Sequence, residues 1–272
     1  MNLKFGDSGR DVITVQALLK NRGYSFIVPD GDFGPMTRDA ILDFQRKHML
    51  VEDGIVDDDL LELLMGNYPG PDIFGVDVSH WQPKIDWKTV KQSKIEFAYI
   101  KASEGVHLIA PDAKKQATGA KAVGLPVGYY HFGSLNDPNV IADADKEAKF
   151  FSQVMKGLPK SDLIPVLDLE VNKSNLSPEL VQRWISEFLV EMAAQGYPKV
   201  ILYSYTPFLD ANLPNNHILG NVPLWIAQYR NVQYPKMPKG WTSYVMWQYT
   251  STGEVAGIGK CDVNKCKKIP YL

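Results

Sequence analysis

The chain has 272 residues, of which 45% are apolar and 22% charged, and its formal net charge is −2. This length and composition are ordinary for a globular protein, and they exclude a collagen-like repeat, a long disordered tail and a disulfide-dense miniprotein. The near-neutral charge argues against nucleic acid or anionic membrane as a partner. The sequence contains no run of ~18 apolar residues, so no transmembrane helix is predicted. We expect a monomer that neither binds nucleic acid nor inserts into a membrane.

Charge and tryptophan content divide the chain into two parts. Residues 1–68 carry 7 Lys and Arg against 12 Asp and Glu, whereas residues 69–272 carry 22 against 19. All six tryptophans lie at or after Trp81. The change falls at residues 67–72, where Pro and Gly favour turns and extended backbone. We predict a first domain over residues 1–67, a linker over 68–72 and a second domain over 73–272.

The first domain is predicted to hold three helices. Apolar residues recur at helical spacing from Val12 to Leu19, after Asp7-Ser8-Gly9, which offers N-cap chemistry. A second helix follows Pro35, and a third, shorter one covers residues 60–64 after an acidic first turn. Two similar Asp-Gly turns, at residues 30–34 and 53–57, indicate turns that pack alike.

The second part alternates β-rich runs with helical stretches. The β-rich runs cover residues 73–79, 95–101, 125–132, 163–170, 200–205, 222–228 and 243–249, with a weaker run at 261–264. The helical stretches are clearest at residues 113–122, 142–155 and 178–194. This alternation predicts a parallel sheet, which seven or eight strands would close into a barrel. Because the segments after Tyr205 are too short or too polar for full helices, we expect several late helices to be absent.

The strongest chemical signal is Pro165-Val166-Leu167-Asp168-Leu169-Glu170. In a strand, Asp168 and Glu170 share one face with Cα atoms ~6.6 Å apart, at the end of the strand where barrel enzymes build active sites. Repulsion and burial would keep a proton on one of the two carboxyls near neutral pH, which suits cleavage of a glycosidic bond. The alternative is an exposed strand end with two solvated acids.

Two further acids, Asp77 and Asp262, lie in the first and last β-rich runs. Those strands are neighbours in a closed barrel, so four acids would meet in one negative pocket suited to an oxocarbenium-like transition state. For Asp77 alone, a turn or capping role is the alternative. Aromatic residues near the predicted strand ends could cover sugar rings, although we expect half of them to be packing only: Tyr99, Tyr130, Tyr203, Trp225, Tyr229 and Trp247.

Other chemistries have little support in the sequence. The five histidines lack metal-ligand spacing, so we expect neither a metal nor another cofactor, and His131 is interpreted as a hydrogen-bonded structural residue. No nucleophile elbow or phosphate-binding loop occurs. We expect Cys261 and Cys266 to be free thiols, and the lysines at 265, 267 and 268 to form a solvated patch.

Residues 75–272 resemble glycoside hydrolase family 25, the lysozymes that cleave between N-acetylmuramic acid and N-acetylglucosamine. The resemblance is carried by ordered blocks at residues 75–79, 97–105, 127–132, 165–170, 223–227, 247–249 and 262–264. It implies an α/β fold, an irregular TIM-like (β/α)5(β)3 barrel, preceded here by a small all-α three-helix module. It also implies that Glu170 is the general acid, that Asp168 orients the 2-acetamido group, and that Asp77 and Asp262 position substrate and tune charge.

The same resemblance implies a set of substrate contacts, and it leaves retention against inversion open, because acetamido participation is an exception to the carboxylate-distance rule. The residues expected to bind substrate are Tyr99, Lys101, Tyr130, Tyr203, Trp225 and Gln248.

Residues 3–64 resemble the three-helix peptidoglycan-binding domain of cell-wall hydrolases, through residues 6–12, 30–34, 37, 44–45 and 53–56. In this module the resemblance points to Asp30 and Phe33 as wall-binding residues. The family's usual Gly and Thr-Trp pair is replaced by Asp57-Asp58-Asp59.

Together these features predict a muramidase whose partner is bacterial peptidoglycan, to which the module tethers it. Because the first residues lack the apolar segment of a secretory signal, we expect a phage endolysin, made in the host cytoplasm and acting on the wall or periplasm after release. The alternatives are a secreted autolysin, a delivered antibacterial effector, an amidase or peptidase, and a wall-binding protein with an inactive barrel.

Overall fold

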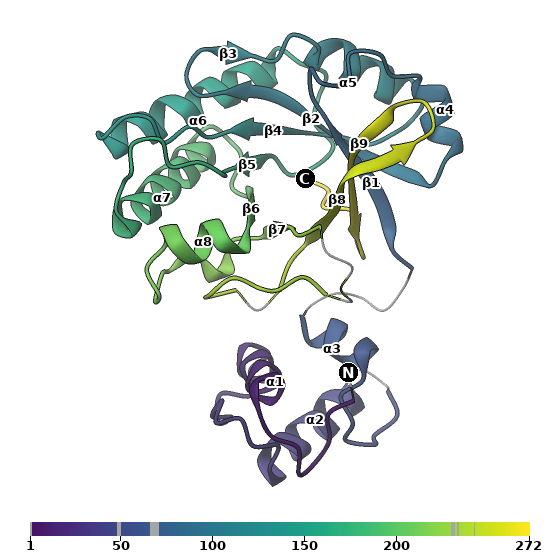
Figure 1. Cartoon of the computed structure of the whole chain (residues 1–272), viewed down its shortest axis with the longest axis vertical. Coiled ribbons are helices and arrows are strands. Elements are labelled where there is room, and N and C mark those ends of the chain that lie inside the picture. Colours follow the sequence, from purple (N-terminus) through teal and green to yellow (C-terminus); the bar gives the residue numbers. More distant parts are fainter. Residues whose placement is uncertain (1, 48–49, 66–70, 230–231, 233, 242) are drawn as a thin grey trace. The chain divides into compact units, whose positions relative to one another are not determined.

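A computed structural model of the chain describes residues 2–47, 50–65, 71–229, 232, 234–241 and 243–272. The chain divides into two compact units, Met1–Pro71 and Asp72–Leu272 (Figure 1). Most of the expected linker, residues 68–70, lies outside the described residues. Within the described part of the chain, no helix combines the length and the apolar character needed to cross a membrane.

The first unit contains the three predicted helices, α1 (Arg10–Asn21), α2 (Pro35–Lys47) and α3 (Asp58–Met65). Pro35 is the first residue of α2, and two acidic residues in the first turn of α3 complement the positive end of its dipole. The N-cap of α1 lies in the predicted run Asp7-Ser8-Gly9. The capping position is Gly9, which has no side chain to accept the free backbone N–H groups, and the Asp7 carboxylate accepts the Lys4 N–H instead.

The two Asp-Gly turns are bound in the same way by one glutamine each. From α1, the buried Gln16 donates to Asp30 Oδ1 at 2.8 Å and accepts from the Gly31 N–H at 2.9 Å. From α2, Gln45 donates to Asp53 Oδ1 at 2.8 Å and accepts from the N–H of the following glycine at 3.0 Å. The repeated turns seen in the sequence therefore pack alike.

The second unit is a closed barrel of eight strands. Its strands in chain order are β1 (Ile73–Val78), β2 (Ile95–Glu104), β4 (Val127–Phe132), β5 (Val166–Asp168), β6 (Ile201–Tyr205), β7 (Leu224–Ala227), β8 (Met246–Val255) and β9 (Gly259–Cys266). The order around the ring is β1-β9-β8-β7-β6-β5-β4-β2, closed by parallel pairing of β2 with β1, and β9 is antiparallel to both its neighbours. The short β3 (Leu108–Ile109) pairs only with β2.

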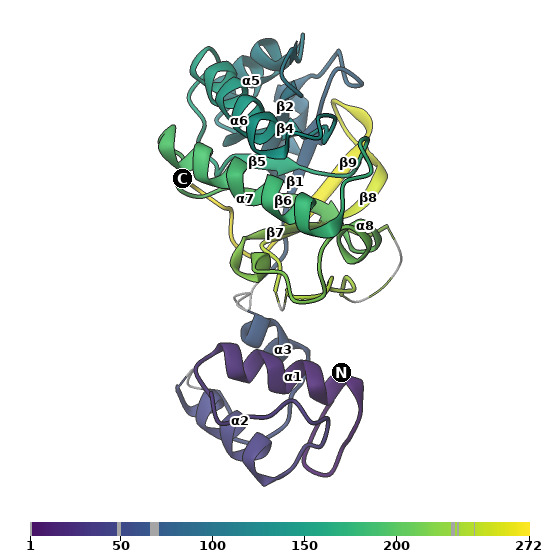
Figure 2. The same ribbon diagram turned by 90° about the vertical axis from the view of Figure 1, so that its left-hand side faces the viewer.

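Five helices follow the first strands of the barrel (Figures 1 and 2). They are α4 (Trp87–Gln92), α5 (Ala113–Ala122), α6 (Val140–Lys156), α7 (Pro178–Ala194) and α8 (Thr206–Asn212). A 3₁₀ turn, η1 (Leu219–Asn221), precedes β7, and no α-helix follows β7 or β8 within the described part of the chain. The (β/α)5(β)3 architecture is thereby confirmed.

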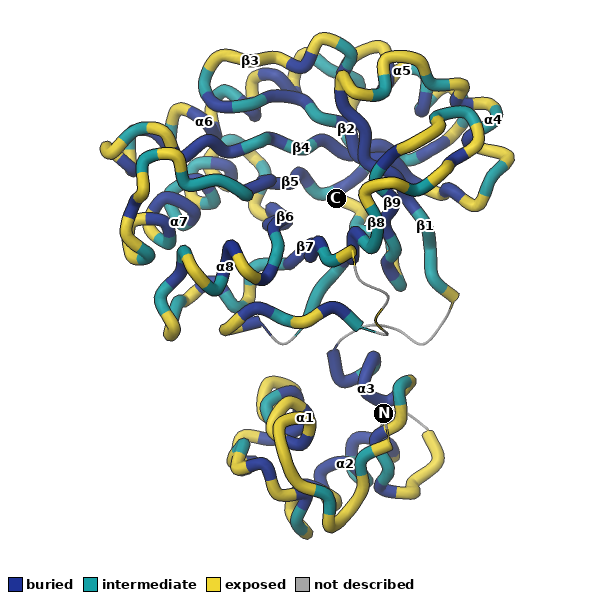
Figure 3. Tube along the Cα trace, in the orientation of Figure 1, coloured by how far each residue is buried: buried dark blue, intermediate teal, exposed yellow. Residues whose placement is uncertain are grey.

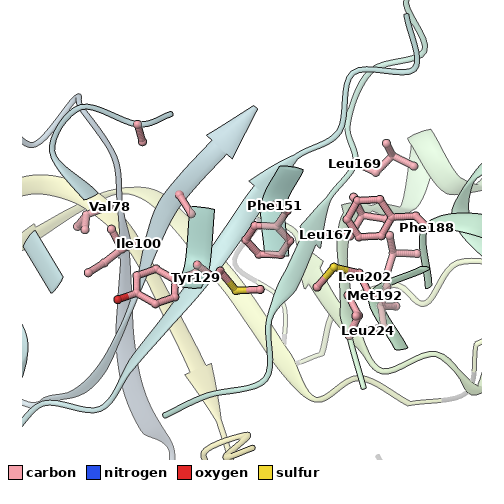
Figure 4. Packing of buried hydrophobic residues seen from close by; sticks show 14 of the residues in the cluster. Val78, Ile100, Tyr129, Phe151, Leu167, Leu169, Phe188, Met192, Leu202 and Leu224 are labelled. Carbon is pink, nitrogen blue, oxygen red and sulfur yellow. The ribbon is translucent and has the colours of Figure 1, made fainter. Parts of the chain in front are cut away.

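Two apolar layers lie on opposite faces of the barrel wall, which is largely buried (Figure 3). Outside the wall, side chains such as Leu167 and Leu202 pack with Phe151 of α6 and with Phe188 and Met192 of α7 (Figure 4). Inside it, a second cluster fills the ring: Phe97, Tyr99, Leu163, Val166, Ile201, Tyr203, Trp225, Ala227, Met246 and Cys266.

Both cysteines of β9 are free and buried, as predicted. Cys261 belongs to the outer layer and Cys266 to the inner one. Five residues along a strand separate two Cα atoms by ~16 Å, far beyond the reach of a disulfide. The expectation of a solvated lysine patch is wrong for two of its members. Lys265 and Lys267 both form ion pairs with Asp72, at 3.2 and 3.0 Å.

Candidate active site

The four acidic residues predicted from the sequence meet in one cavity of about 220 Å³. Strand β1 contributes Asp77, β5 ends at Asp168, and β9 contributes Asp262, which pairs directly with Asp77 across the antiparallel ladder. Glu170 lies two residues beyond the end of β5. The cavity is lined by Asp77, Ser79, Trp81, Lys101, Tyr130, Phe132, Val166, Asp168, Glu170, Tyr203, Trp225, Tyr229, Gln248 and Asp262.

Asp168 and Glu170 form a coupled carboxyl pair. Burial raises the pKa of both groups, and the charge of Glu170 raises the pKa of Asp168 further. Asp168 Oδ1 is buried and has no hydrogen-bond partner in the described residues. The positive charge of Lys101 acts in the opposite direction on the pKa of each. Burial and the neighbouring charge therefore favour a protonated carboxyl in this pair, which is the form that an acid catalyst requires.

Lys101 cannot compensate the acids alone, because its Nζ also pairs with Glu104 Oε2 at 2.8 Å. Its ammonium group lies 4.9 Å from the centre of the Phe132 ring, which limits its movement. The four carboxyl groups of the pocket therefore outnumber its positive charge. Burial raises the pKa of one of them, Asp262, to about 8.

Asp77 differs from the other three acids because it accepts hydrogen bonds from neutral side chains. Gln248 Nε2 and Asn264 Nδ2 each donate to Asp77 Oδ2 at 2.8 Å. Burial raises the pKa of Asp77 to about 6, and both amide contacts lower it against that effect.

Most of the expected substrate contacts line the cavity, namely Lys101, Tyr130, Tyr203, Trp225 and Gln248. Tyr99 does not. Its ring is 0% exposed, its hydroxyl donates to the Ile164 carbonyl at 3.0 Å, and the ring occupies the space that a side chain at Gly128 would fill. The expectation that Tyr99 touches substrate is therefore corrected: it is a core residue.

Five cavity-lining residues were not in the expected set of catalytic and substrate-binding residues, although Tyr229 was among the aromatic residues considered for sugar rings: Ser79, Trp81, Phe132, Val166 and Tyr229. Trp81 is 78% exposed and follows Asp77 in the loop after β1, where its backbone N–H donates to Ser79 Oγ at 3.3 Å. Tyr229 is 53% exposed and follows β7. In the sequence, Trp81 and Tyr229 each lie just beyond a predicted strand, four residues after Asp77 and Trp225 respectively. That position was the signal that could have identified them as cavity residues.

In the first unit, the expected wall-binding residues are not free side chains. Phe33 is 1% exposed and belongs to the core, so it cannot contact a ligand, and that expectation is corrected. Asp30 accepts from Gln16 and from the Asp32 N–H at 2.9 Å, which fixes its turn.

His131 is a buried structural residue, as predicted. Its Nδ1 lies 2.9 Å from Ser103 Oγ and its Nε2 lies 2.8 Å from Glu147 Oε2, which joins β4 to α6. Among the residues that the structure describes, no group of three His, Cys, Asp or Glu side chains could hold a metal ion.

Comparison with known proteins agrees with this geometry. The sequence profile of glycosyl hydrolases family 25 matches residues 76–258, and that of a peptidoglycan binding domain matches residues 8–64. Lysozyme M1 of Streptomyces globisporus is 33% identical over 200 residues, covering 70% of this chain and 66% of that protein. The autolytic lysozyme of Clostridium acetobutylicum is 34% identical over 192 residues, covering 70% of this chain and 55% of that protein. The chain thus spans less than two thirds of the length of either relative.

Among solved structures, the crystal structure of the CTP1L endolysin matches with a TM-score of 0.57 at 29% sequence identity, covering 71% of this chain and 65% of that one. The segment matched by the family profile contains three of the four cavity acids, and Asp262 lies just beyond it. The chain belongs to glycosyl hydrolases family 25 and carries an N-terminal peptidoglycan-binding domain.

Proposed function

We propose that this protein hydrolyses the β-1,4 bond between N-acetylmuramic acid and N-acetylglucosamine in bacterial peptidoglycan. The observation that carries the proposal is the coupled pair of Asp168 and Glu170 at the carboxyl end of β5, inside a cavity with two further acids. Membership of a family whose relatives include lysozymes supports the choice of bond.

In this proposal Glu170 is the general acid, because it is the more exposed of the pair and lies beyond the strand end, where a leaving oxygen can reach it. Its proton passes to the glycosidic oxygen as the C–O bond breaks and the bonding electrons go to that oxygen. Asp168 orients the 2-acetamido group of the substrate. The negative charge of the pocket stabilises the oxocarbenium-like centre. Water then bonds to the anomeric carbon, and its proton passes to the Glu170 carboxylate, which restores the acid.

The N-terminal domain is proposed to bind peptidoglycan and so hold the barrel near an insoluble substrate. Tethering replaces repeated encounters by a high local concentration, which raises the rate without new contacts in the active site.

The bond that is cleaved can be read from the products. The full chain is incubated with purified peptidoglycan in the presence and absence of a chelator, and the fragments are analysed by mass spectrometry. We expect fragments with reducing muramic acid ends, no free peptide amines, and equal activity with the chelator. Released peptides would identify an amidase or peptidase instead, and the absence of new ends would identify a wall-binding protein.

For the biological role we propose a phage endolysin, which acts after the cytoplasmic membrane has been opened. The match to the CTP1L endolysin supports this role, whereas the autolytic relative favours a secreted autolysin. The two differ in where the protein is found before lysis. Immunodetection in the producing strain, with the natural upstream sequence kept, should find an endolysin inside intact cells and an autolysin outside them.

A further inference from the structure

The carboxylate of Asp77 is held by a hydrogen-bonded network that reaches across the barrel. Both donors, Gln248 of β8 and Asn264 of β9, bind the same oxygen, Oδ2. Asp77 itself lines the cavity, and because neither amide donates to its other oxygen, Oδ1, we take Oδ1 as the atom that meets a substrate group. Asn264 is 0% exposed and does not line the cavity, so it can act on the reaction only through another residue.

The orientation of the Asn264 amide is fixed by an indole N–H, which cannot accept in return, and that of the Gln248 amide by two tyrosine hydroxyls. Trp225 Nε1 donates to Asn264 Oδ1 at 2.9 Å, so the amino group of Asn264 must point to Asp77. The hydroxyls of Tyr203 and Tyr229 both donate to Gln248 Oε1, at 2.7 and 2.6 Å, which turns its amino group to Asp77 as well. Three side chains thus determine which atoms face the carboxylate.

These contacts distinguish Asp77 from the other ionisable groups of the pocket. An amide donates a hydrogen bond but neither gives up nor takes a proton near neutral pH, so it favours the carboxylate over the carboxylic acid. Asp168 is coupled to Glu170, and Asp262 pairs with Asp77 in the ladder; among the residues that the structure describes, no pair of amide donors to any of these three is found. The charged and titratable groups around Asp77 are Asp262, Lys101, Tyr130, Asp168, Glu170, Tyr203 and Tyr229.

We propose that Asn264 and Gln248 are positioning residues that keep Asp77 ionised and aim its Oδ1 at the substrate, with Trp225, Tyr203 and Tyr229 fixing the two amides. In this proposal Gln248 acts through Asp77, because its Nε2 donates to Asp77 Oδ2 and its Oε1 accepts from the hydroxyls of Tyr203 and Tyr229. With Asp77 ionised, the carboxyl groups that bind protons in the pocket are those of Asp168, Glu170 and Asp262. This inference rests on the proposed function in that Asp77 takes part in cleavage.

The test replaces Asn264 by leucine, which has similar size and no donor. Reducing-end release is measured from pH 4 to pH 9 at low peptidoglycan concentration, so that the profile reports the free enzyme. Without the Asn264 donor the acidic form of Asp77 becomes more favourable. We expect the acidic limb of the profile of Asn264→Leu to move by roughly one pH unit to higher pH, with the alkaline limb in place. The matched control is Asn215→Leu, an exposed asparagine whose contact is with Lys239, and its profile should equal that of the unaltered chain.

A purely structural role for Asn264 would lower the rate equally at every pH, and that result would overturn the proposal, as would an unchanged profile. Should Asn264→Leu fail to fold, Trp225→Phe provides the second variant, because it keeps an aromatic ring in the core and removes the indole N–H that orients Asn264, at the cost of a smaller ring in the cavity lining. It should shift the same limb in the same direction.

A double variant separates this inference from the proposed function. In an Asp77→Asn background, adding Asn264→Leu should cause no further shift of the acidic limb, because the group on which Asn264 acts is no longer titratable. A further shift would place the effect of Asn264 on another group. Failure of the unaltered chain to release reducing ends would instead contradict the proposed function.

Discussion

At the residue scale, the chemistry of the cavity depends on how four carboxyl groups divide their protons. Asp77 has amide donors, burial raises the pKa of both Asp168 and Glu170, and burial raises the pKa of Asp262 to about 8. Burial is the largest cause of each raised pKa. Neighbouring carboxylates raise the pKa of Asp168, Glu170 and Asp262 further, whereas hydrogen bonds lower that of Asp77. This arrangement suits a protonated acid catalyst close to an ionised carboxylate, that of Asp77.

Replacing Glu170 by glutamine should therefore abolish most cleavage while leaving the fold intact. The amide cannot protonate the leaving oxygen, and loss of a general acid costs on the order of 10²–10⁴ in rate. Reducing-end release and a thermal melt measure the two effects. Glu179→Gln, at an exposed position in the first turn of α7, should retain full activity. Turnover of Glu170→Gln equal to that of the unaltered chain would mean that another group is the acid.

The raised pKa of Asp262 also makes stability depend on pH. A carboxyl whose pKa is about 8 in the folded chain and close to 4 when unfolded favours the folded state only in its protonated form. The free energy of unfolding should therefore fall as the pH rises from about 4 to about 8. Thermal melts across that range measure the slope, and Asp262→Asn should make it shallower. An equal slope in that variant would place the effect on other groups.

At the element scale, each helix-to-turn joint of the N-terminal domain depends on one buried glutamine. Gln16 of α1 and Gln45 of α2 each satisfy backbone and carboxylate groups of an Asp-Gly turn, including the N–H of a glycine at positive φ. Without the glutamine side chains, the buried N–H groups of these turns would lose their hydrogen-bond acceptors, and an unsatisfied buried N–H lowers stability.

Gln16→Leu should accordingly destabilise the domain by about 1–3 kcal/mol, the cost of unsatisfied buried groups. Chemical denaturation of the full chain, followed by a signal assigned to the first unit, measures the change. Thr14→Ala is the matched control on the same helix, because Thr14 is exposed and its hydroxyl bonds only to the Arg10 carbonyl. Equal stability of the two variants would show that the turn does not depend on Gln16.

At the scale of the whole molecule, a barrel with a deep acidic cavity is joined to a separate small domain. Soluble fragments reach the cavity by diffusion alone, whereas an insoluble wall requires the enzyme to stay at a surface. The proposed tether should matter only for the second kind of substrate.

A fragment that begins at Asp72 tests this, since it keeps the ion pairs of Asp72 with Lys265 and Lys267. On intact wall preparations its activity should fall severalfold or more, because the effective concentration supplied by the tether is lost. On soluble glycan fragments it should equal the full chain. Circular dichroism verifies that the fragment is folded, and an equal loss on both substrates would contradict tethering.

Much of this protein could be predicted from its sequence, because local patterns determine elements and their order. The period of two along each strand indicates which residues face the interior, and five of the six contacts expected from the family resemblance line the cavity. The Asp-x-Glu spacing was sufficient to place two carboxyls on one face. The boundaries of β5 were less accurate, since the chain leaves the sheet after Asp168 and Glu170 reaches the cavity from beyond the strand.

The period of two predicts which residues face the barrel interior. It does not predict how deep each side chain lies or which residue it contacts, and the tertiary structure determines both. Tyr99 and Tyr203 both face inward, yet only Tyr203 reaches the cavity, because the bare backbone of Gly128 gives the Tyr99 ring a place in the core. The contact of Asn264 with Asp77 joins residues 187 positions apart. It exists because pairing of β9 with β1 closes the barrel, and no local pattern encodes such a pairing.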